Sequence, residues 1–194
     1  MCSKVALWAS PALICGFMGI SAFGLGAARA DDAACKGIAD AMLTNSKTPY
    51  HSVGTIAFDP KDPPIPGAEA MPAIKTETIF TGTQVFVKLP TGQWKDIHAN
   101  IADLRTKVKD SASNFNDCTR LPDEKADGKT LAVYTGGDKT DTMSVSTKVW
   151  VAGGAIQRSE TDVGGPTAPD GKVRHQHLSL HYDYADIKAP TDSN

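Results

Sequence analysis

The sequence lacks the short motifs that mark many enzyme active sites. It has no G-x-S-x-G nucleophile elbow, no P-loop, no H-E-x-x-H pair and no G-x-G-x-x-G fingerprint. Its Gly-rich pieces at 136–137, 153–154 and 164–165 fit turns, because none lies between a strand and a helix as an anion-binding loop requires. We therefore expect a protein that is not an enzyme and that uses no cofactor.

An excess of positive charge is also missing. The chain has 20 Lys and Arg against 22 Asp and Glu, a formal net charge of −2, and its bases are scattered. Binding to a phosphate backbone needs a basic patch or stripe, so we expect no nucleic-acid partner. No stretch after the N-terminal region is apolar enough to span a bilayer, so we do not expect an integral membrane protein.

The first thirty residues have the pattern of a secretory signal peptide. Lys4 precedes an apolar run from Val5 to Leu25, and Ala28-Arg29-Ala30 offers the small residues that signal peptidase reads. An uncleaved membrane anchor is the alternative, but Pro11 and several glycines interrupt the run. We predict export to the periplasm, cleavage after Ala30 and a single domain over residues 31–194.

Cysteine is scarce, with four in the whole chain. Cys2 and Cys15 lie in the signal region, and Cys15 lacks the small preceding residue that a lipidated cysteine needs, because Ile14 stands there. Cys35 and Cys118 then remain as an even pair in an oxidising compartment. The chain has no C-x-x-C spacing of the kind that redox pairs use. We therefore predict a structural disulfide between Cys35 and Cys118.

Two segments have the periodicity of amphipathic helices. In residues 32–43, Ala34, Ile38, Ala41 and Met42 fall on one stripe. In residues 98–112 and just before them, apolar side chains recur at helical spacing, at Ile97, Ile101, Leu104 and Val108. We expect an N-terminal helix and a mid-chain helix, both covering the rest of the fold.

Most of the remaining chain alternates between apolar and polar residues, as half-buried strands do. We predict strands over 51–58, 73–80, 83–89, from 93, over 129–136, 142–152 and 155–163, and from 174. The segments 59–72 and 164–172, rich in proline or glycine, are predicted to be surface loops. Few helices among strands joined by hairpins favour a mainly β (α+β) fold. We expect a curved antiparallel sheet, or incomplete β-barrel, of seven or eight strands.

The alternation also predicts which side chains lie on the concave face of this sheet. Trp150 falls on the polar side of its strand, where it is either an exposed recognition residue or covered by a loop or helix. The apolar residues either hold a ligand or simply fill a core. The predicted lining, closed by the mid-chain helix, is Leu131, Val133, Met143, Val145, Val149, Val151, Leu178, Leu180, Tyr182, Ile101, Leu104 and Val108.

The stretch RHQHLSLHYDYADIKAP (174–190) holds three of the five histidines. Residues two apart in a strand share a face at a spacing of about 6.6 Å, so His175 and His177 could bind one metal ion, while His181 lies about 13 Å beyond His177. Zinc takes three or four protein ligands in most sites, and only two are visible here. A strand with a polar outer face explains the histidines without a metal. We therefore predict no metal site and keep His175 and His177 as the less favoured alternative.

Several stretches together resemble a known group of proteins. They are TPYHS (48–52), ETIFTGTQVFVKLPTGQW (77–94), CTRL (118–121), KVWVAGGAIQRSETDV (148–163) and LSLHYDYADIKAP (178–190). This pattern is similar to that of small bacterial periplasmic proteins whose fold looks like the LolA/LolB lipoprotein-carrier superfamily. The resemblance implies an incomplete antiparallel barrel with an apolar concave face, helices that act as a plug or lid, and the binding of acyl chains.

These observations favour an exported, non-enzymatic binding protein. The resemblance implies that its partner is an apolar small molecule, a lipid or a lipoprotein. The alternative is an envelope module that contacts another envelope protein through the loops 59–72 and 164–172.

Overall fold

The computed structural model describes residues 32–63, 73–139, 143–166 and 171–191. The predicted signal peptide, residues 64–72 of the first predicted loop and residues 167–170 of the second therefore lie outside the described residues. The described elements are α1 (Asp32–Asn45), β1 (Tyr50–Phe58), β2 (Ile74–Phe80), β3 (Val85–Lys88), β4 (Trp94–Asp96), α2 (Ile101–Ser113), β5 (Asn116–Ala126), β6 (Lys129–Lys139), β7 (Ser144–Ala152), β8 (Ala155–Pro166) and β9 (Val173–Asp183).

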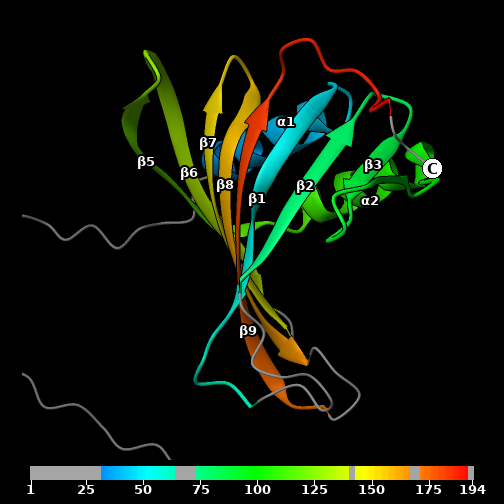
Figure 1. Cartoon of the computed structure of the whole chain (residues 1–194). Helices are drawn as coiled ribbons and strands as arrows, with labels where there is room; N and C mark the ends of the chain where they lie inside the picture. The colour runs from blue at the N-terminus through cyan, green and yellow to red at the C-terminus, as the bar shows by residue number, and fades with distance from the viewer. Residues whose placement is uncertain (1–31, 64–72, 140–142, 167–170, 192–194) are drawn as a thin grey trace, which may run out of the picture.

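All nine strands belong to one antiparallel sheet in the order β4-β3-β2-β1-β9-β8-β7-β6-β5. The last strand, β9, lies between β1 and β8, so that the two halves of the chain meet in the middle of the sheet (Figure 1). The sheet is curved and does not close, and β4 and β5 are its edges. The predicted mainly β, incomplete barrel is confirmed.

The sheet has one strand more than the upper predicted count, because β5 had no clear strand pattern. Its sequence, NDCTRLPDEKA, contains a proline and several charged residues. Pairing with β6 shifts register between Leu121 and Glu124, where Pro122 stands. An edge strand tolerates a proline, since its outer N–H groups have no partner to lose.

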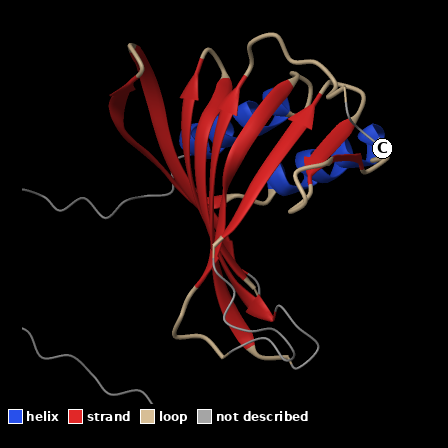
Figure 2. Cartoon of the chain, viewed as in Figure 1, coloured by secondary structure: helices blue, strands red, loops and turns tan. Residues whose placement is uncertain are grey.

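Both helices lie on the same side of the sheet (Figure 2). We call this side the inner face and the opposite side the outer face. α1 runs close to its predicted bounds. α2 begins later than predicted, at Ile101, because Asn100 caps it by accepting bonds from the N–H groups of Ala102 and Asp103. Ile97 is therefore outside the helix, and 46% of its surface is exposed.

The apolar stripe of α1 packs against the inner face. Ala34, Ile38 and Ala41 are buried in one cluster with Val149 and Ile156 of the sheet. The predicted disulfide is confirmed: Cys35 of α1 bonds to Cys118 of β5, with an S–S distance of 1.98 Å. It joins the helix covalently to the edge of the sheet.

Candidate functional site: an apolar cavity under the helices

A cavity of about 280 Å³ lies between the inner face and the two helices. This volume is close to the lower end of the range of small-molecule sites, roughly 300 to 1,000 Å³. The cavity is lined by Met42, Asn45, Ser46, Tyr50, Phe80, Leu104, Val108, Phe115, Thr147, Val149, Ile156, Ser159, Thr161, Leu178, Leu180 and Tyr182.

Half of the predicted apolar lining meets in this cavity. The strands bring Val149 from β7 and Leu178, Leu180 and Tyr182 from β9, and α2 brings Leu104 and Val108. The register explains the sheet side, because Val149 pairs with Ser159, and Ser159 pairs with Leu180. Directly paired residues on neighbouring strands point to the same face of a sheet.

Leu131 and Val133 lie on the outer face instead of the predicted concave face. Val133 pairs with Trp150 in the neighbouring strand, and all three residues form a second buried cluster, separate from the one under α1. The next residue, Tyr134, pairs with Val149 and packs with the α1 cluster. The predicted alternation along β6 is present, but the residues on the inner face are Ala132 and Tyr134, and Leu131 and Val133 are on the outer face.

The other four predicted residues do not reach the cavity. Val151 lies on the inner face but is covered by the α1 cluster. Val145 is half-buried nearer the other end of β7, and Met143 precedes that strand with 46% of its surface exposed. Ile101 is the first residue of α2 and is half-buried outside the lining.

Arg105 fixes α2 over the cavity. Its Nε donates to the carbonyl oxygen of Ser46 at 3.1 Å, and its Nη2 donates to the carbonyl oxygen of Gly82 at 3.2 Å. These bonds join α2 to the end of α1 and to the turn between β2 and β3. Leu104 and Val108 are one helical turn apart, and both reach the cavity.

An aromatic group forms one end of the cavity. The ring of Tyr50 lies 5.5 Å from that of Phe80 and 5.3 Å from that of Tyr182, in a tilted and an edge-to-face arrangement. Burial, followed by the nearby Tyr182, raises the pKa of Tyr50 to about 12. Burial also raises the pKa of Tyr182, opposed by a hydrogen bond with Ser159. Both phenols are therefore uncharged at neutral pH.

Three hydroxyl groups interrupt the apolar floor. Thr147 of β7 and Thr161 of β8 are direct cross-strand partners, and their Oγ1 atoms are 3.2 Å apart. Ser159 lies two residues away on β8, on the same face. Thr147 and Ser159 are only 9% and 8% exposed. These groups give an otherwise apolar cavity a small capacity for hydrogen bonding.

Sequence reasoning missed ten of the lining residues. Tyr50 and Phe80 stand at the ends of their strands, and Ile156 at the start of its strand, where alternation is least informative. Thr147, Ser159 and Thr161 are polar, so an apolar pattern could not select them. The alternation did carry a signal for them, because all three side chains lie on the inner face of the sheet, as that of Val149 does. The others are Met42 and Asn45 in the last turn of α1, Ser46 just after that helix, and Phe115 between α2 and β5.

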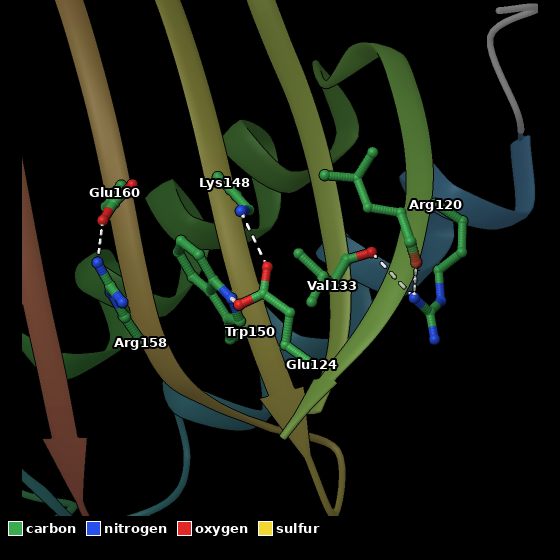
Figure 3. A network of polar contacts seen from close by, with 8 residues as sticks. Arg120, Glu124, Val133, Lys148, Trp150, Arg158 and Glu160 are labelled. Atoms are coloured by element: carbon green, nitrogen blue, oxygen red, sulfur yellow. Dashed lines mark hydrogen bonds and ion pairs between the residues drawn. The ribbon is translucent and has the colours of Figure 1, made fainter. Parts of the chain in front are cut away.

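Trp150 is covered, with only 3% of its surface exposed, although it lies on the outer face. The described side chains that contact its ring or its Nε1 belong to strands, not to a loop or a helix. The side-chain cations of Lys148 and Arg158 lie 4.3 and 4.6 Å from its ring centre. Its Nε1 donates to Glu124 at 2.8 Å, and Lys148 donates to the same carboxylate (Figure 3). The indole is thus part of the sheet's packing.

The histidines of β9 point to the outer face, as the alternation predicted. His175 contacts the carboxylate of Asp62 at 3.1 Å, and His177 contacts that of Asp162 at 2.7 Å. His175 and His177 therefore each have an acidic partner of their own. Among the described residues, no group of three or more His, Cys, Asp or Glu side chains has the arrangement of a metal site.

A second hollow, of about 820 Å³, lies on the outer face. It is larger than the inner cavity, but charged side chains are part of its wall. Lys88 donates to Glu77 at 2.9 Å within it, and the exposed Lys75 also lines it. An apolar ligand would have to desolvate these groups, so the inner cavity is the better apolar site.

Known proteins offer few matches to this chain. No family model and no curated protein matches it. Among solved structures, it is similar to the lipoprotein LppX of Mycobacterium tuberculosis, with 16% identity and a TM-score of 0.48 over 82% of this chain and 100% of that one. It is also similar to LprF of Mycobacterium bovis, with 10% identity and a TM-score of 0.48 over 84% and 99% of the two chains.

A third similarity is to a domain from Vibrio parahaemolyticus described as an outer membrane lipoprotein-sorting protein. The identity is 10% and the TM-score 0.27, over 81% of this chain and 94% of that one. Within the described ranges, no helix is long and apolar enough to cross a bilayer.

Proposed function

We propose that this protein is an exported periplasmic binding protein, not an enzyme, that holds an apolar ligand, a lipid or a lipid-bearing partner between its sheet and its helices. The observation that supports this is the unfilled cavity itself. Its apolar walls include Leu178 and Leu180 of β9 and Leu104 and Val108 of α2. Transferring apolar ligand surface from water into such a site is favourable by about 25 cal/mol per Å².

The first test is whether the protein binds apolar molecules at all. Native mass spectrometry of protein purified from the periplasm should reveal a co-purifying apolar molecule, and the chain should begin at Asp31 after signal cleavage. Delipidated protein should then bind the neutral fluorescent probe N-phenyl-1-naphthylamine. Protein that carries no such molecule and takes up no probe would contradict the proposed function.

A matched pair of variants locates the site. Val108→Phe adds bulk inside the cavity and should weaken probe binding at least about tenfold, because this needs only ~1.4 kcal/mol of lost contact. Val53→Phe makes the same change on the outer face, where Val53 is 48% exposed, and should leave binding unchanged. Circular dichroism and the thermal midpoint would confirm that both variants fold. Equal binding by the two variants would place the probe elsewhere.

A further inference from the structure

The inner cavity contains polar groups but, among its described lining residues, no side chain that is charged at neutral pH. Among the described residues that line it, none is Lys, Arg, His, Asp or Glu. Its polar side chains are one amide, from Asn45, the hydroxyls of serine and threonine, and the two tyrosine phenols. Because burial raises the pKa values of both tyrosines, the lining as a whole carries no charge at neutral pH.

The oxygen of the Asn45 amide is already engaged by the protein. Its Oδ1 accepts a bond from the backbone N–H of Ile156 at 3.0 Å and another from the phenol of Tyr184 at 3.0 Å. It serves to hold the end of α1 against β8 and the segment after β9. Its oxygen therefore contributes little to a ligand.

The pair of Thr147 and Thr161 is different, because its bonding capacity is not used up. The two hydroxyls carry two hydrogens between them, and the bond that joins them uses one. One O–H donor is left over, together with unused oxygen lone pairs. The hydroxyl pair lies on the cavity floor next to Leu178, which pairs directly with Thr161.

We infer that the natural ligand is electrically neutral, and that an ester or alcohol oxygen of the ligand meets the hydroxyl pair Thr147–Thr161 while its hydrocarbon part lies along Leu178 and Leu180. This inference rests on the proposed function and narrows it to a ligand class. An ionised carboxylate in the cavity would lose its hydration without gaining a counter-ion, at a cost far greater than that of a neutral oxygen. A neutral oxygen needs only the one donor that the pair supplies.

A matched set of compounds that share a twelve-carbon chain tests the charge preference. Methyl dodecanoate, 1-dodecanol and dodecanoate would each compete with bound N-phenyl-1-naphthylamine above the pKa of the fatty acid. The ester and the alcohol should displace the probe at concentrations at least about tenfold below those needed for dodecanoate, given the cost of burying the anion. Dodecanoate that competes as well as the ester would overturn the inference.

A second measurement tests the hydroxyl pair. Thr147→Val with Thr161→Val removes both hydroxyls at nearly constant volume and should weaken the ester about two- to tenfold, the usual range for one hydrogen bond. The affinity for the probe, measured on the same sample, reports whether the cavity is intact. Thr135→Val is the control, because Thr135 pairs with Lys148 and faces outward. Should the double variant not fold, Thr147→Ala with Thr161→Ala removes the same two hydroxyls and gives the same comparison.

The outcomes separate the two proposals. Binding of the probe with no preference between ester and carboxylate would refute the neutral-ligand inference and leave the proposed function standing. Failure of the wild-type protein to bind any of these compounds would refute the proposed function itself. An ester affinity that does not change in the Thr147→Val/Thr161→Val variant would remove the role of the hydroxyl pair.

Discussion

Burial shifts the pKa of single side chains around the cavity, and Tyr50 shows this most clearly. Its phenol lies against Phe80 and Tyr182, in a part of the molecule that water does not reach freely. The charged form of the phenol is therefore disfavoured, and the pKa rises to about 12. The same burial that shapes the cavity thus makes folding depend on pH in the alkaline range.

The sign of that dependence follows from proton linkage. Below pH 10 both folded and unfolded chains keep Tyr50 protonated, so its contribution is fully present. Between pH 10 and about 12 the unfolded chain releases the proton while the folded chain retains it, so the free energy of unfolding falls as pH rises. Urea titrations across this range should show a smaller fall for Tyr50→Phe than for the wild type. Equal slopes for the two proteins would show that Tyr50 is not the group concerned.

At the scale of elements, β1 and β9 approach each other closely at Gly54. A Cβ atom built on Gly54 would lie 1.9 Å from the backbone oxygen of Ser179 and 2.8 Å from Leu180. Only glycine permits this contact, since real Cβ atoms essentially never approach so closely. The position of β9, which carries Leu178 and Leu180 beneath the helices, therefore depends on one small residue, Gly54, in the neighbouring strand β1.

Gly54→Ala should accordingly destabilise the protein by more than about 2 kcal/mol, because the backbone of β1 or β9 must move to admit the methyl group. Gly164→Ala is the matched control. The methyl group there would meet the Ser144 hydroxyl at 2.8 Å and the His175 ring at 3.0 Å, which are ends of side chains that can turn away. Urea midpoints should therefore fall much further for Gly54→Ala. A change no greater than that of the control would mean that the two strands are free to separate.

At the scale of the whole molecule, the disulfide joins parts of the chain that lie 83 residues apart. Closing a loop of this length removes freedom from the unfolded chain and stabilises the fold by roughly 4 kcal/mol in the chain-entropy model. The bond also holds α1 against the sheet, on the side where the helix covers the inner face. Its loss should therefore affect both stability and the cavity.

Replacing both cysteines, as Cys35→Ser with Cys118→Ser, should lower the free energy of unfolding by roughly 4 kcal/mol. Reduction of the wild-type protein with dithiothreitol should bring its urea midpoint close to that of the variant. Oxidised wild-type protein in the same buffer is the control. A variant as stable as the oxidised wild type would show that packing of Ala34, Ile38 and Ala41 suffices to hold α1.

Much of the fold could be predicted from residue patterns, and the failures have physical causes. The alternation in β7, β8 and β9 and the helical stripe of α1 are local consequences of burying one side of an element. β5 escaped prediction because an exposed edge strand needs no apolar alternation. The cavity could be predicted only in part, because six of its side chains are apolar members of regular elements, while most of the other ten are polar or lie at or beyond the ends of elements.

The sequence by itself determined eight of the nine described strands, the two helices and, with two cysteines after the signal region, the disulfide. Only the tertiary structure decided which side of each strand faces the cavity. Alternation divides the residues of a strand between its two faces, but it does not show which of the two is the inner face. In β7 the neighbouring residues Val149, Trp150 and Val151 are all buried, so apolarity alone could not choose between the faces. Which face of a strand becomes the inner one depends on the side of the sheet that the helices cover and on the position of β9 between β1 and β8. These two features set which side chains pack against one another.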